Sequence, residues 1–316
     1  MNNLTGKVAV VAGATRGAGR GIARMLGEAG ATVYVSGRST AETPATPGRS
    51  ETIDETAQLV DEAGGKGIAV RVDHTSEEDV RRLFERVQKE SGTLDILVNN
   101  VWGGDDLTEW GTSFWELSME KGKTLLERAI FSHILTSRHG VPLMVNQKSG
   151  LVIEITDGDH FGYRANLVFD LVKTSVIRLA YGMANELREH TVAAVALTPG
   201  YLRSEAMLDR YGVTEENWQE GVKEDPDFIE SETPCYVGRA VAHLAADANI
   251  LDKTGRVFSS WDLAQQYGFR DIDGRQPHWD RHLEKHHPQY VVQKCDDGFY
   301  DYWRGQFDIE DLQEEK

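Results

Sequence analysis

The chain has 316 residues, and its 34 Lys and Arg against 51 Asp and Glu give a formal net charge of −17. Nucleic-acid binding draws on clusters of Lys and Arg, so this composition argues against such a partner. No run approaches the roughly 18 apolar residues of a membrane span, and the first residues lack the apolar stretch of a signal peptide. We therefore expect a cytoplasmic protein with no nucleic-acid or membrane partner.

Apolar runs typical of buried strands alternate with amphipathic helical patterns along the chain. Strands are expected at 8–12, 32–35, 67–70, 94–98, 151–156, 192–197 and 256–259, and helices at 53–63, 77–90, 167–188 and 236–246. This alternation predicts an α/β fold, a doubly wound parallel sheet with helices on both faces. We expect one domain over residues 1–275 and a C-terminal tail over 276–316, rich in His, aromatic and acidic residues.

A glycine-rich turn follows the first expected strand. It contains Gly13, Thr15, Arg16, Gly17, Ala18 and Gly19 and leads directly into a helical pattern. Gly13 permits a tight turn, while Gly17 and Gly19 let main-chain amides approach a pyrophosphate at the helix N-terminus. Glycines also serve plain turns, but the position between a first strand and a helix is the context that nucleotide binding requires. The sequence therefore predicts a dinucleotide site.

The chain resembles the short-chain dehydrogenase/reductase family over roughly residues 5–265. The glycine spacing, Asn99-Asn100 after the fourth strand and Pro199-Gly200 after the sixth match the family's motifs. A narrower similarity, to the dehydrogenase/reductase member 1-like group, rests on 114–116, 237–241 and segments between 262 and 275. The resemblance implies a Rossmann fold of about seven strands that binds a nicotinamide cofactor. It also implies that the following residues contact the cofactor: Asp73, Asn99, Lys173, Pro199, Gly200 and Ser204.

The end of the second strand favours one nicotinamide cofactor over the other. An acidic residue there binds the 2′-hydroxyl of NAD, whereas the 2′-phosphate of NADP requires cations. Here Gly37 stands in the acid's place and Arg38 follows it. Arg38 and Arg16 could clamp a phosphate from two sides, although both could also be ordinary surface residues. In a chain of net charge −17, two cations at one nucleotide site favour NADP(H).

The resemblance implies a catalytic centre of Tyr, Lys, Ser and Asn, and three of these four are absent. Lys173 matches the Lys, but Phe169 stands where the family has the Tyr that donates a proton. The Ser position falls on Asp157, and the Asn position falls on Ala129. Residues four apart share a helix face, so Phe169 and Lys173 are expected to project into the same space. Lys173 can still bind the ribose hydroxyls there.

Another side chain could replace the missing acid. The candidates are Asp157, Asp159, His160, Tyr163 and Tyr201. Asp157 is favoured by its position, and an ionised Asp157 would suit a cationic iminium, which already carries its proton. General acid catalysis contributes about 10²- to 10⁴-fold, so loss of the Tyr does not by itself abolish hydride transfer. The predicted catalytic positions are therefore Asp157, Tyr163, Phe169 and Lys173.

Three functions stay open at this stage. The first is an NADPH-dependent oxidoreductase that transfers hydride to a carbonyl or to an imine or iminium. The second is an NADP-binding sensor or scaffold without chemistry, and the third is a non-redox lyase or isomerase on the same fold.

Aromatic and acidic residues gather in the segments expected around a substrate. Trp102 leads through Asp105 and Asp106 to further aromatic residues, and Tyr201 opens the loop 200–232, which in the family closes over substrate. Aromatic walls with acids suit a bulky or cationic small molecule, although each Trp could equally pack against helices. We predict that Trp102, Asp157 and Tyr201 bind the substrate.

Three histidines near the C-terminus are candidates for a metal site. His278, His282 and His286 recur every four residues, a spacing able to bind zinc from a helix. The surrounding charges favour a solvated segment instead, so we predict no metal site.

By resemblance, the apolar helix from Leu167 implies a homodimer or homotetramer.

Overall fold

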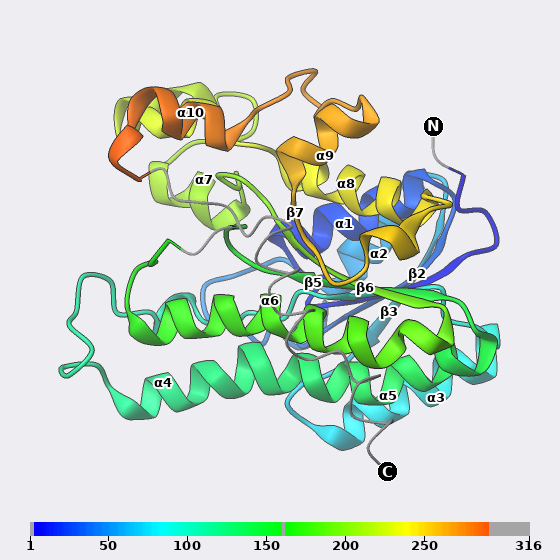
Figure 1. The fold of residues 1–316 in the computed structure, drawn as a ribbon. Coiled ribbons are helices and arrows are strands. Elements are labelled where there is room, and N and C mark those ends of the chain that lie inside the picture. The colour runs from blue at the N-terminus through cyan, green and yellow to red at the C-terminus, as the bar shows by residue number, and fades with distance from the viewer. Residues whose placement is uncertain (1–2, 160–161, 291–316) are drawn as a thin grey trace, which may run out of the picture.

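The computed structural model describes residues 3–159 and 162–290 and has a seven-stranded parallel sheet at its centre (Figure 1). The strand order is β3-β2-β1-β4-β5-β6-β7. The strands are Val8–Ala12 (β1), Thr32–Gly37 (β2), Lys66–Arg71 (β3), Ile96–Asn99 (β4), Gly150–Ile155 (β5), Val192–Thr198 (β6) and Val257–Ser259 (β7). The predicted doubly wound α/β sheet is confirmed. Because the strand order reverses beside β1, a crevice for a ligand is expected at the carboxyl ends of β1 and β4.

Helices cover both faces of the sheet. The α-helices are Gly17–Glu28 (α1), Ile53–Glu62 (α2), Glu77–Ser91 (α3), Met119–Leu126 (α4), Ser132–Gln147 (α5), Leu167–Leu187 (α6), Glu205–Tyr211 (α7), Pro234–Ala246 (α8), Ser260–Tyr267 (α9) and Trp279–His286 (α10). Helices α1, α2, α8 and α9 pack on one face, and α3, α5 and α6 pack on the other (Figure 1). Successive strand residues point to opposite faces, so Ala9 and Val11 of β1 join the first core while Val8 and Val10 join the second.

Helix α6 holds the residues expected at the catalytic centre. Its N-terminus is capped by Asn166, whose side chain accepts a hydrogen bond from the main-chain N–H of Phe169 at 3.0 Å. Such a cap satisfies a donor that the helix leaves unpaired. Phe169 and Lys173 then follow one turn apart on the same helix, as predicted.

A π-helical segment interrupts the long helix that precedes β5. Residues Glu127–Phe131 form this segment (η2) between α4 and α5. Ala129, the position where the family has its Asn, lies in it and is buried. A π-helical turn is often found at functional sites, because it changes the direction of side chains on a long helix.

The segment after residue 275 packs against the domain. The side chain of Gln276 donates to the carbonyl oxygen of Phe269 at 3.0 Å, and the hydroxyl of Tyr236 donates to the carbonyl oxygen of Pro277 at 3.2 Å. Helix α10 follows and lies above α7 in the view of Figure 1. The part of the predicted tail from residue 291 lies outside the described residues.

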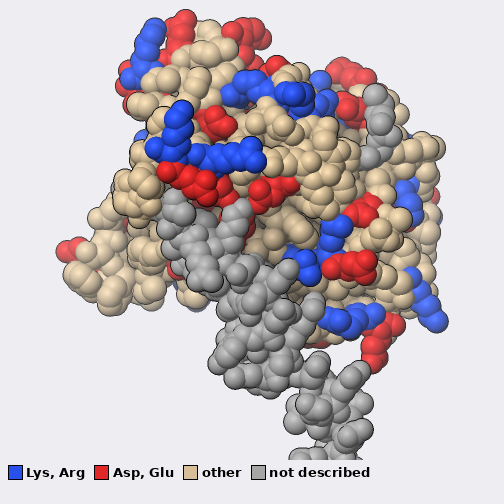
Figure 2. Space-filling view, turned by 45° about the horizontal axis from the view of Figure 1, so that its top comes forward, with Lys and Arg blue, Asp and Glu red and all other residues tan. Residues whose placement is uncertain are grey.

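Charges of both signs are interspersed on the surface. In Figure 2, Lys and Arg side chains stand beside Asp and Glu side chains in several places on that face, and uncharged residues cover much of the described surface between them. Among the helices described, none combines the length and apolar character that crossing a bilayer requires.

Candidate functional site

A cavity of about 300 Å³ opens at the carboxyl ends of β1, β2 and β4, where the strand order reverses. Most of the residues predicted to bind cofactor line it. These are Gly13, Thr15, Arg16, Gly17, Ala18, Arg38, Asp73 and Ser204. Trp102, predicted on the substrate side, also lines this cavity.

The glycine turn has a geometry that other residues would not allow. Gly13 has a φ of +79°, and a Cβ there would lie 2.7 Å from the carbonyl oxygen of Asn100. A Cβ on Gly19 would lie 2.2 Å from the carbonyl oxygen of Gly13. Both positions therefore require glycine, and the turn leads straight into α1. Main-chain N–H groups at the start of a helix form a favourable site for a phosphate.

Two arginines, Arg16 and Arg38, line the cavity. Arg38 is half-buried in the cavity wall and makes no hydrogen bond or ion pair with any residue that the structure describes. Arg16 donates from Nη2 to the hydroxyl of Thr46 at 2.8 Å, while its buried Nη1 makes no hydrogen bond and lies 3.5 Å from a carboxylate oxygen of Glu51. The guanidinium of Arg38 in particular has donors to offer an anion.

Neighbouring side chains crowd the position before Arg38. A Cβ on Gly37 would lie 2.5 Å from the hydroxyl oxygen of Thr15 and 3.0 Å from the side chain of Ile53. Asp73 also lines the cavity. Burial raises the pKa of this carboxyl, but hydrogen bonds from Thr75 and the nearby charge of Arg38 hold it below its usual value. Asp73 is therefore an anion that can accept hydrogen bonds.

A carboxylate that sequence reasoning missed occupies the start of α1. Glu205, the first residue of α7, accepts a hydrogen bond through Oε2 from the main-chain N–H of Gly17 at 2.7 Å. Its other oxygen lies 3.6 Å from Nε of Arg20. An anionic group thus lies where the turn is expected to receive a pyrophosphate. Ser204, just before it, caps α7 by accepting from the N–H of Met207.

Aromatic rings lie beside Lys173, which is not itself part of the cavity lining. Its Nζ lies 3.9 Å from the centre of the Trp102 ring and 5.5 Å from that of the Phe169 ring. Phe169 is buried and contacts Trp102 and Trp110, with ring centres 5.4 Å apart in both pairs. Burial lowers the pKa of Lys173, and the negative charges of Asp157 and Asp105 oppose that shift. Trp102 thus contacts Lys173 and also forms part of the cavity wall.

The candidate proton donors differ in their surroundings. Asp157 is exposed, and its negative charge acts to raise the pKa of Lys173. Tyr163 is 68% exposed. Tyr201 donates its hydroxyl proton to Asp225 at 2.7 Å, and burial raises its pKa. Asp159 is buried. His160 lies outside the described residues.

A buried polar network lies beneath the site, and it contains Asn99. The amide of Asn99 donates to Oε1 of Glu154 at 2.6 Å and to the hydroxyl of Ser137 at 2.8 Å. The other oxygen of Glu154 lies 2.6 Å from Nδ1 of His133, whose Nε2 lies 3.0 Å from the carbonyl oxygen of Val101. This network supports the chain directly before Trp102.

Not all predicted cofactor residues line the cavity. Asn99 is fully buried, while its neighbour Asn100 lines the cavity and donates to the carbonyl oxygen of Gly13 at 2.9 Å. Pro199 and Gly200 lie outside the lining, and the N–H of Gly200 donates to Glu232 at 3.0 Å. Sequence reasoning missed Glu154, although a Glu within the apolar run of β5 was a usable signal.

Comparisons with known proteins agree with this architecture. A family model described as short chain dehydrogenase matches residues 7–211. Dehydrogenase/reductase SDR family member 1 of Mus musculus is 38% identical over 277 residues, which cover 86% of this chain and 85% of that protein. The human protein of the same name is 37% identical over the same length. A solved structure from Xanthomonas campestris has a TM-score of 0.71 at 22% identity, covering 92% of this chain and 97% of that one.

Proposed function

Since the chain belongs to the short-chain dehydrogenase/reductase family of oxidoreductases, which use NAD or NADP, we propose that it is an NADPH-dependent reductase. The proposed substrates are carbonyl compounds and imines or iminium ions. The observation that carries this proposal is Arg38, a guanidinium without a described partner in the wall of a cavity that a glycine turn opens.

The residues present fit NADP. The glycine turn and the N-terminus of α1 would hold the pyrophosphate, Asp73 would accept from the adenine, and Arg38 with Arg16 would hold the 2′-phosphate. Gly37, at a position crowded by Thr15 and Ile53, lacks the acidic side chain that would bind the hydroxyl of NAD. When bound, the cofactor supplies the hydride. Lys173 would bind the ribose, although Trp102 lies against it in the described structure.

The residues around Lys173 favour a substrate that needs little help from an acid. Phe169 has no proton to give, and the hydroxyl of Thr156 donates to the main-chain oxygen of Lys173 at 2.8 Å. Asp157 is exposed beside them and would stabilise a cationic group. An iminium ion accepts hydride without a proton donor, so these side chains suit it better than they suit a ketone. The aromatic ring of Trp110, 67% exposed, offers a wall for a bulky or cationic substrate.

A direct test follows NADPH oxidation against panels of aldehydes, ketones and cyclic imines. We expect turnover, fastest with cyclic imines, and we expect Asp157→Asn to lower the rate on iminium substrates more than the rate on aldehydes. NADPH that binds but is never oxidised with any member of the panels would favour the alternative, a cofactor-binding sensor or scaffold. Turnover of a substrate without a change in NADPH absorbance would instead favour a lyase or isomerase.

We also propose that the chain forms a homodimer or homotetramer through α5 and α6. Leu171 of α6 is 50% exposed and Ile134 of α5 is 42% exposed, and Phe131 just before α5 is 64% exposed. Large exposed apolar side chains favour association with a partner surface. Sedimentation at equilibrium tests this, and a monomer at micromolar concentration would contradict it.

A further inference from the structure

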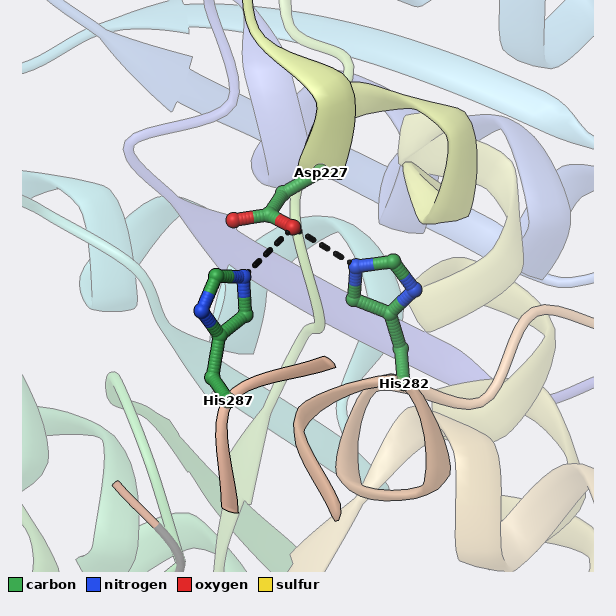
Figure 3. A group of neighbouring side chains, drawn as sticks. All are labelled: Asp227, His282 and His287. Atoms are coloured by element: carbon green, nitrogen blue, oxygen red, sulfur yellow. Dashed lines mark hydrogen bonds and ion pairs between the residues drawn. The ribbon is translucent and has the colours of Figure 1, made fainter. Parts of the chain in front are cut away.

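The carboxylate of Asp227 and the imidazoles of His282 and His287 converge at a point outside the lining of the cofactor cavity. Asp227 lies in the short helix Pro226–Glu230 (η5), His282 lies in α10, and His287 directly follows α10. Oδ1 of Asp227 lies 2.8 Å from Nε2 of His282 and 2.8 Å from Nε2 of His287 (Figure 3). The three potential ligand atoms all lie within 4.8 Å of one another. Two segments that are far apart in the sequence, η5 and the end of α10, therefore bring these three donor atoms together.

The surrounding contacts fix these side chains. The side chain of His282 is only 8% exposed, and its ring stacks on Trp279 with ring centres 5.5 Å apart and an angle of 16° between the planes. The side chains of Asp227 and His287 are each 30% exposed, so the point between the three is reachable from solvent. The N–H of Asp227 donates to Asp225 at 3.0 Å, which holds the main chain in place. A ligand set held in this way loses little conformational entropy on binding an ion.

We propose that Asp227, His282 and His287 bind a divalent transition-metal ion, with Zn²⁺ the best match. Two imidazole nitrogens and one carboxylate oxygen are donors that zinc accepts, and three protein ligands leave one position for water. Ligands about 2.0 Å from zinc at tetrahedral angles stand about 3.3 Å apart. The nitrogen–oxygen distances of 2.8 Å therefore have to widen by only about half an ångström. Coordination through Nε2 requires each imidazole to carry its remaining proton on Nδ1.

The position of the site points to a structural role for the metal. Asp227 adjoins Phe228, whose ring packs on Tyr201 with centres 5.5 Å apart, and Tyr201 also contacts Trp279 at 5.6 Å. Tyr201 lies at the start of the segment predicted to close over substrate. A metal shared by η5 and the end of α10 would fasten the C-terminal segment to the back of that loop. This inference concerns binding and stability, and it does not depend on the proposed reductase activity.

Zinc titration of the full chain, produced without a histidine tag and freed of metal by a chelator, tests the site. We expect calorimetry to show one Zn²⁺ per chain, a rise in melting temperature on binding, and visible absorption bands of a four-coordinate site when Co²⁺ replaces zinc. Asp227→Asn is the key variant, because the amide oxygen can still accept both hydrogen bonds but carries no charge. It should weaken zinc binding by at least about tenfold with little change in the melting temperature of the metal-free protein.

A second variant and a control make the result decisive. His287→Ala removes the more exposed imidazole and should also abolish the rise in melting temperature, whereas His190→Ala, an exposed histidine outside the cluster, should bind zinc as the unmodified chain does. The proposal fails if the unmodified chain does not bind one equivalent of zinc. It also fails if Asp227→Asn and His287→Ala bind zinc as tightly as the His190→Ala control.

Discussion

The main-chain N–H of Gly17 donates a hydrogen bond to Oε2 of Glu205 across 2.7 Å, although the two residues are 188 positions apart in the chain. Gly17 is the first residue of α1 and lines the cavity, so the carboxylate lies where we expect the pyrophosphate of a nucleotide. Negative charge is favoured at a helix N-terminus. A cofactor bound there would have to displace the Glu205 side chain.

Replacing Glu205 with Gln should therefore tighten cofactor binding. The substitution keeps the size of the side chain but removes a negative charge beside the expected pyrophosphate. A helix-terminus charge contributes about 1 kcal/mol, so the dissociation constant for NADPH should fall roughly fivefold. Fluorescence titration with NADPH measures this change.

The matched control is Glu220→Gln, which removes the same charge from a side chain that is 62% exposed in the same loop region. It should leave NADPH affinity unchanged. Equal affinities for the two variants would show that Glu205 does not compete with the cofactor.

Arg38 should determine the preference for NADPH over NADH. Its guanidinium has no described partner, so Arg38→Ala should remove only its contacts with the 2′-phosphate. Charge-assisted hydrogen bonds contribute about 1.5–3 kcal/mol, which corresponds to a loss of roughly tenfold or more in NADPH affinity. NADH affinity should change little. Arg71→Ala, at an exposed arginine that pairs in register with Gly37 on the neighbouring strand, is the control. A similar loss for both nucleotides would refute a role specific to the phosphate.

Sequence reasoning predicted what neighbouring residues determine. The glycine turn before α1 and the shared helix face of Phe169 and Lys173 depend on spacings of a few residues, and the structure has both. The contact of Glu205 with Gly17 depends instead on how α7 packs on α1. No local pattern carries that information, because the loop could approach the turn in several ways.

The histidines of the C-terminal segment show the same limit. Their spacing pointed to a helical face that bears His278, His282 and His286. In the structure His278 caps the N-terminus of α10, and the chain turns after His286 so that His287 lies near His282. The third member, Asp227, is 55 residues from His282. Helical periodicity located one of the three residues and could not locate the other two.

Phe169→Tyr should restore part of the missing acid catalysis. The new hydroxyl would stand one helical turn before Lys173, as in the family's centre, and a general acid contributes about 10²-fold or more when it is well placed. We expect at least about a tenfold rise in ketone reduction. Because Phe169 is only 6% exposed, a hydroxyl without a partner would cost about 1–3 kcal/mol of stability.

Two measurements separate these effects. Steady-state rates report the gain in catalysis, and thermal unfolding reports the cost of burial. Phe131→Tyr, at a side chain that is 64% exposed, should change neither quantity. A destabilised Phe169→Tyr protein with no gain in ketone reduction would show that the pocket lacks more than the hydroxyl.

Glu232 should make stability depend on pH near neutrality. It is 1% exposed, and burial raises its pKa from 4.5 to about 8 against the opposing hydrogen bonds from Ser260 and Gly200. Between these two values the native state keeps a proton that the unfolded state loses. The free energy of unfolding should therefore fall as pH rises through this window, by up to about 1.4 kcal/mol per pH unit.

Glu232→Gln removes this titration and should flatten the dependence. Urea unfolding at pH 5.5, 6.5 and 7.5 measures the slope for the unmodified chain and for the variant. Glu224→Gln, at an exposed glutamate of the same loop, is the matched control and should keep the slope of the unmodified chain. If the slopes of Glu232→Gln and Glu224→Gln coincide, Glu232 is ionised in the native state and the Gly200 and Ser260 donors hold a carboxylate.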